Sequence, residues 1–65
     1  MDGMSLSAGD VVTATVTKVL PFGVLVEYTN VAGLAKGVAG EPGASLELRV
    51  LEFDAARRRF SAELA

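Results

Sequence analysis

Apolar and polar side chains alternate along several short runs of this chain, and that alternation predicts β-strands. In the run from Val11 to Leu20, valine or alanine stands at positions 12, 14 and 16, and threonine stands at positions 13, 15 and 17. Successive residues of a strand point to opposite faces of a sheet, so we expect the apolar set to be buried and the threonines to face water. After Val16 the next residue of buried character is Val19, which predicts a β-bulge at Thr17 and Lys18.

Four more strands are expected downstream. Pro21 ends the first strand, because proline cannot donate to a central ladder, and Thr29 with Asn30 marks a turn. The expected strands and their buried residues are 24–28 (Val24, Val26, Tyr28), 31–36, 46–53 (Leu46, Leu48, Val50, with a second phase break before Phe53) and 59–64 (Phe60, Ala62, Leu64). Residues 37–45 contain Gly37, Gly40 and Gly43 with little apolar content. They predict a mobile loop without regular helix.

The length of the chain allows one small domain. Its 65 residues, 51% of them hydrophobic, are near the lower limit for a chain that folds on one core. We expect residues 1–8 to form a flexible lead and residues 9–65 a single domain. Five strands, two of them bulged, predict an all-β fold: a small five-stranded antiparallel Greek-key barrel of the oligonucleotide/oligosaccharide-binding type, the OB-fold. An SH3-like barrel is the structural alternative.

Composition narrows the chemistry. The chain has no cysteine and no histidine, so it lacks thiolate ligands, disulfides and the usual general base. Its acidic residues are scattered and never take the spacing of a cation-binding loop. We therefore expect no catalytic residues, no metal site and no cofactor, that is, a protein that is not an enzyme. The N-terminus lacks a cationic region and a continuous apolar run, which predicts a cytoplasmic protein without membrane contact.

Phe22 is the first candidate for a functional residue. It stands beside Gly23 at the start of the second predicted strand. Glycine lets the backbone bend there and has no side chain to cover the ring, which favours an exposed docking platform. The alternative is that Phe22 plugs the end of a small core.

An ordered set of short pieces covers nearly the whole chain. The pieces are Gly9-Asp10-Val11-Val12, Val16, Val19, Phe22-Gly23, Gly33-Leu34, Gly43, Leu46-Glu47-Leu48-Arg49-Val50, Phe53-Asp54 and Arg57-Arg58-Arg59-Phe60-Ser61. In this order, from Gly9 to Leu64, they resemble the S1 motif, a family of RNA-binding domains. The resemblance implies a five-stranded OB-fold barrel with RNA lying across the second and third strands and reaching the turn before the fifth.

The same resemblance implies a set of nucleic-acid-binding residues. They are Phe22, Leu25, Lys36, Asp54, Arg58 and Arg59. Leu25 stands where the family commonly has a second aromatic, so stacking would rest mainly on Phe22. Lys36 replaces a common histidine and offers a point charge to phosphate, and the connection after it is shorter than usual in the family. Asp54 equally suits a turn residue that accepts local N–H groups, and the arginines at this turn equally suit a solvated surface.

Two functions remain open. Six basic and eight acidic residues give a net charge of −2, which argues against strong binding to a phosphate backbone. The first hypothesis is a monomeric, weak and largely sequence-tolerant module for single-stranded RNA, with the ribosome or RNA-processing proteins as further partners. The second is a protein-interaction module that docks on a ribosome, an RNA polymerase or a nuclease through Leu25 and Phe22. The RNA hypothesis requires Lys36 and residues 57–59 on the same face as Phe22.

Overall fold

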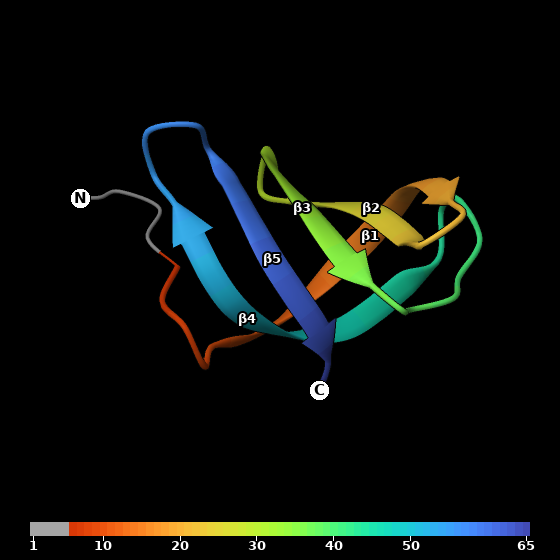
Figure 1. The fold of residues 1–65 in the computed structure, drawn as a ribbon, viewed down its shortest axis with the longest axis horizontal. Coiled ribbons are helices and arrows are strands. Elements are labelled where there is room, and N and C mark those ends of the chain that lie inside the picture. The colour runs from red at the N-terminus through yellow and green to blue at the C-terminus, as the bar shows by residue number, and fades with distance from the viewer. Residues whose placement is uncertain (1–5) are drawn as a thin grey trace.

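Five β-strands close into a barrel in the computed structural model of the chain, which describes residues 6–65 (Figure 1). The strands are β1 (Val11–Leu20), β2 (Gly23–Tyr28), β3 (Val31–Lys36), β4 (Ser45–Asp54) and β5 (Arg59–Leu64). Around the barrel their order is β1-β2-β3-β5-β4. The expected strands agree with these bounds to within one residue. Most of the expected lead, residues 1–5, lies outside the described residues.

The barrel is not entirely antiparallel, and this corrects the sequence-based prediction. β3 and β5 run parallel, with Ala32 opposite Arg59 and Ala35 opposite Ala62, and their arrows point the same way in Figure 1. The other four neighbouring pairs are antiparallel. A parallel pair needs a crossover connection, and the segment that contains β4 provides it by crossing to pair with β1 before β5 returns beside β3. The fold is thus an all-β, five-stranded closed barrel with mixed pairing.

Both predicted bulges are confirmed. The register of β1 on β2 shifts between Val16 and Lys18, and the register of β4 on β5 shifts between Val50 and Glu52. Each bulge adds one unpaired residue and bends its strand more sharply. The two longest strands can therefore wrap around a small core.

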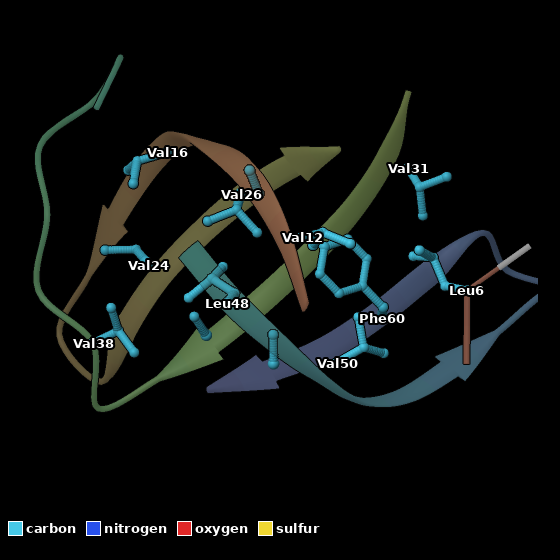
Figure 2. Close-up of a cluster of buried hydrophobic side chains, with 13 residues drawn as sticks. Leu6, Val12, Val16, Val24, Val26, Val31, Val38, Leu48, Val50 and Phe60 are labelled. Carbon is cyan, nitrogen blue, oxygen red and sulfur yellow. The ribbon is translucent and has the colours of Figure 1, made fainter. Parts of the chain in front are cut away.

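The core is built from the inward residues of all five strands, and Figure 2 shows their side chains converging. It consists of Leu6, Val12, Ala14, Val16, Val24, Val26, Val31, Ala35, Val38, Leu48, Val50, Phe60 and Ala62. Tyr28, Leu46 and Phe53 pack against it while partly exposed. The ring of Phe60 lies on Gly33, where an added Cβ would come within 2.4 Å of the ring.

Two residues expected in the core are exposed. Val19 is opposite the buried Val24 and Leu64 is opposite the buried Leu48, so both have the inward register. Nevertheless their side chains are 51% and 57% exposed. β1 pairs with β4 only as far as Thr15, and β5 pairs with β3 only as far as Ala62. Beyond those points each strand has one neighbour instead of two, so inward-facing side chains lose their cover.

Residues outside the strands fill the two ends of the barrel. Leu6, which the sequence assigns to the lead, lies near Val31 and Phe60, and Val38 lies at the opposite end of the core (Figure 2). Each is 7% exposed. The backbone N–H of Gly9 donates to the carbonyl oxygen of Val50 over 2.7 Å, which holds the segment before β1 against β4.

The loop between β3 and β4 contains no helix, as expected, but hydrogen bonds attach it to the barrel. The Gly37 N–H donates to the carbonyl of Phe22 and the Gly43 N–H to that of Val16, each over 2.8 Å. The Val16 N–H in turn donates to the carbonyl of Ala44 over 2.8 Å. These bonds and the buried Val38 argue against the mobility predicted from composition.

Hydrogen exchange will test this revised view of the loop. We expect the amide proton of Gly43 to exchange at least about tenfold more slowly than that of Ala39, because only the former is held by a backbone carbonyl within residues 6–65. Exchange rates measured by NMR at individual amides decide the matter. Equal rates at the two residues would show that the loop opens independently of the barrel.

Candidate functional site

A row of paired residues crosses the outer surface of the barrel. Lys18 on β1 is opposite Leu25 on β2, Leu25 is opposite Leu34 on β3, Leu34 is opposite Ser61 on β5, and Ser61 is opposite Glu52 on β4. Residues opposite each other on neighbouring strands project from the same face. Neither leucine is fully buried. We call these five residues the outer row.

Three shallow grooves meet at Leu34. One, of about 350 Å³, runs between Leu25 and Arg59. A second, of about 380 Å³, leads from Leu34 to Lys36 and across β5 to β4. A third, of about 270 Å³, leads to Asp54 and again to Arg59. The fold therefore gathers Leu25, Lys36, Asp54 and Arg59 around Leu34, although they come from four different strands.

Phe22 lies apart from these grooves. Its side chain is 56% exposed, so it does not plug the core. It lines a hollow of about 530 Å³ together with Val19 and Val38, at the end of the barrel that Val38 closes. The backbone of Phe22 lies close to Lys36, because the next residue, Gly23, is opposite Lys36 on β3. The exposed ring thus lies beyond the end of β3 that carries Lys36 and lines none of the three grooves around Leu34.

Gly23 is needed for that junction. A Cβ at this position would lie 2.3 Å from the carbonyl oxygen of Ala35 and 2.9 Å from the Cα of Lys36. Both contacts are with backbone atoms, which cannot move aside as a side chain can. The close approach of β2 to β3 places Phe22 next to the strand end that carries Lys36.

The turn between β4 and β5 separates the arginines. The side chain of Asp54 accepts a hydrogen bond from the Arg57 N–H over 3.2 Å and forms an ion pair with the Arg57 guanidinium over 3.8 Å. Asp54 is therefore a turn-stabilising residue, whatever else it contacts. Arg58 occupies the turn with a left-handed φ of 54°. Arg59 begins β5 and lines two of the three grooves, and Arg58 lines none of the three.

Sequence reasoning missed several residues of this face. Leu34 belongs to the Gly33-Leu34 piece but is not among the predicted binding residues, yet all three grooves meet at it. Its position two residues before Lys36 on the same strand is the sequence signal for it. Leu51 lines the groove that contains Lys36 and is 48% exposed. The sequence signal for Leu51 is the interruption, before Phe53, in the alternation of apolar and polar residues. It indicates that a residue near Phe53 does not follow the inward and outward pattern of the strand.

The charge around the outer row is mixed. Lys18, Lys36 and Arg59 surround the leucines, but Glu52 and Asp54 line the same grooves. Within residues 6–65, no three acidic residues are placed to hold a metal ion. No helix in this part of the chain is long and apolar enough to cross a membrane. The face therefore offers an apolar centre bordered by both cations and carboxylates.

Comparisons with known proteins show the fold of the chain. No protein-family model matches the sequence, and no curated relative does. An uncharacterized protein, MJ1198 from Methanocaldococcus jannaschii, superposes with a TM-score of 0.82 at 14% identity, over 95% of this chain and 96% of that one. GSP13 from Bacillus subtilis superposes with a TM-score of 0.81 at 20% identity, over 92% of this chain and 56% of GSP13.

A third similar structure is a chain in the a/eIF2alpha-aDim2p-rRNA complex from Pyrococcus horikoshii. It superposes with a TM-score of 0.82 at 18% identity, over 94% of this chain and 45% of that chain. This chain therefore spans about half the length of two of these three structures. At such identities the likeness establishes a shared barrel fold.

Proposed function

We propose that this chain is a non-enzymatic module that binds single-stranded RNA on the outer face of β2, β3 and β5. The observation that carries the proposal is the meeting of three grooves at Leu34, which places Lys36 and Arg59 at the border of an apolar centre. Bases expose flat apolar faces and their linkages carry phosphate, so a single strand fits such a surface. We infer further that the barrel is an OB-fold of the S1 type.

The arrangement supports weak binding. Leucines at positions 25 and 34 give apolar contact to a base but no aromatic stacking, which leaves Phe22 as the stacking residue at the end of the barrel. Lys36 and Arg59 are the phosphate contacts, with Arg58 adding charge from the adjoining turn. A net charge of −2 reduces the attraction of RNA from a distance. Such a site discriminates little between sequences over most of its length.

Two further considerations support an RNA ligand. The ordered motifs from Gly9 to Leu64 resemble the S1 family, and one structure of similar fold belongs to a complex that contains rRNA. On these grounds we propose that its partners are single-stranded RNA and the ribosome or RNA-processing proteins; that it acts as a cytoplasmic monomer is a separate part of the proposal.

Salt dependence will test the proposal. If two to three phosphates are contacted, the logarithm of the affinity should fall with the logarithm of salt concentration with a slope of about −0.7 per phosphate, from micromolar or weaker affinity at physiological salt. Lys36→Ala together with Arg59→Ala should make the slope shallower by about 1.4. Phe22→Ala should weaken binding about fivefold or more without changing the slope, because stacking releases no counterions. Fluorescence anisotropy of labelled RNA measures both quantities.

The same titration has an outcome that contradicts the proposal. At low salt, where electrostatic attraction is least screened, RNA should shift the amide resonances of Leu34, Lys36 and Arg59. If none of these moves at any RNA concentration, the face does not bind RNA.

A protein-interaction module is the second candidate, and one observation favours it. The centre of the face is a leucine pair with acidic neighbours, and such a pair can also take up an apolar protein segment. Affinity for a protein partner should then depend on Leu25 and Phe22 and respond little to salt.

A further inference from the structure

The bulge in β4 turns two consecutive residues to the outside of the barrel. Val50 is opposite Ala62 and Glu52 is opposite Ser61, so Leu51 has no partner on β5. Leu51 and Glu52 are both exposed, whereas strict alternation would bury one of them. Bulges commonly redirect a side chain in this way near functional sites. The apolar side chain of Leu51 therefore projects beside the carboxylate of Glu52, which is the last residue of the outer row.

A small residue makes the hollow beside them. Ser61 lies between Leu34 on one neighbouring strand and Glu52 on the other, and neighbouring strands are about 4.8 Å apart. Because the serine side chain is short, the surface dips between the two larger ones. The resulting groove of about 380 Å³ is lined by Leu34, Leu51, Glu52 and Ser61, with Lys36 at its border. It has apolar walls, one carboxylate and one cation.

We propose that this groove seats a guanine base of the bound RNA, with the Glu52 carboxylate accepting hydrogen bonds from the base. Guanine is the one standard base that presents two adjacent N–H donors, N1–H and the 2-amino group, to the two oxygens of a carboxylate. Adenine and cytosine place an acceptor nitrogen beside their amino group, and uracil flanks its N–H with two carbonyl oxygens. A carboxylate repels each of those acceptors.

The remaining groups of the groove fit a nucleotide as well. Leu34 and Leu51 contact the faces of the base, and Lys36 is placed for an adjacent phosphate. Within residues 6–65 the ion pairs are Arg49 with Glu63 and Arg57 with Asp54, so neither Glu52 nor Lys36 is neutralised by one of them. This inference rests on the proposed RNA-binding function. It adds one position of base preference to an otherwise tolerant site.

Substituted RNAs will test the inference. The probes are a short labelled oligouridine, the same RNA with one central guanosine, and the same RNA with inosine there, which lacks only the 2-amino group. We expect the guanosine RNA to bind about five- to tenfold more tightly than either of the others, a modest factor because the carboxylate is exposed. Glu52→Gln should reduce this preference to about twofold or less.

Glu47→Gln is the matched control, because Glu47 is an exposed carboxylate on the same strand and lines none of the three grooves. Both substitutions remove one negative charge and should raise the affinity for oligouridine, Glu52→Gln by more because it also removes the repulsion of uracil carbonyls in the groove, but only Glu47→Gln should retain the preference for guanosine. If all three RNAs bind with equal affinity, or the preference survives Glu52→Gln, the guanine site is refuted while RNA binding stands. If no RNA binds at low salt, the proposed function and this inference both fail.

Discussion

Replacing Val16 by aspartate should leave the chain unfolded at room temperature. Val16 is 1% exposed and belongs to the buried core, where a carboxylate would have neither water nor a partner. We expect a loss of at least about 3–5 kcal/mol. Stabilities of about 0.05–0.15 kcal/mol per residue imply only about 3–10 kcal/mol for a domain of this length. Circular dichroism during thermal unfolding measures the effect.

Thr15→Asp is the control, since Thr15 is adjacent in sequence but faces water. Its cost should stay below about 1 kcal/mol, including repulsion from the opposite Glu27. If the Val16 variant keeps a cooperative transition at the native temperature, the inward and outward faces of β1 are wrongly assigned.

Gly23→Ala should produce the second largest effect, and it should do so through the backbone. The added methyl group would overlap the carbonyl oxygen of Ala35, so β2 and β3 would have to separate where they begin to pair. We expect a loss of about 2–3 kcal/mol or more in the free energy of unfolding. RNA affinity of the folded fraction should fall as well, because Phe22 and Lys36 are positioned by this junction. Chemical denaturation and RNA titration measure the two effects separately.

Gly40→Ala provides a comparison within the same chain. A Cβ there would lie 3.2 Å from a methyl group of Val16 and 3.4 Å from one of Leu46, and side chains can adjust by that amount. Its cost should be below about 1 kcal/mol. If Gly23→Ala and Gly40→Ala destabilise the chain equally, the close contact between Gly23 and the backbone of β3 is not the cause of the loss in stability.

Local patterning predicts most of this fold, because the facing of a strand residue depends on its immediate neighbours in sequence. The alternation that ends at Val16 predicts which face of β1 is buried, and the interruptions of alternation predict both bulges. Val19 and Leu64 show where this reasoning ends. The predicted inward direction of these two residues is confirmed by their strand partners. Their burial, however, depends on how far the neighbouring strand extends, and the length of that pairing is set by the closure of the barrel.

Contacts distant in sequence could not be predicted in the same way. Nothing in residues 31–36 or 59–64 alone indicates that these segments pair in parallel. Leu6 and Val38 read as parts of a lead and a loop, and only the open ends of a closed barrel give them a place in the core. Composition correctly indicated that the loop lacks a helix, but it could not reveal hydrogen bonds to carbonyl groups of β1 and of the turn before β2.

The candidate site also combines features that local sequence predicts with features that depend on contacts distant in sequence. Phe22 and Gly23 could be singled out from the sequence because their relation is local. The convergence of Leu34, Leu51 and Ser61 depends on the registers of three strands and on one bulge, so it emerges only from the structure.

The parallel pairing of β3 with β5 has a consequence for the order of events during synthesis of the chain. Residues 32–35 leave the ribosome well before residues 59–62, with which they pair, and contacts so distant in sequence form late and slowly. Until then β3 has an open edge and Gly33 lacks the ring of Phe60 that covers it. Arg59 and Ser61 arrive with the same strand. The proposed RNA face and the closed barrel therefore appear together, and an incomplete nascent chain has no such face with which to capture RNA.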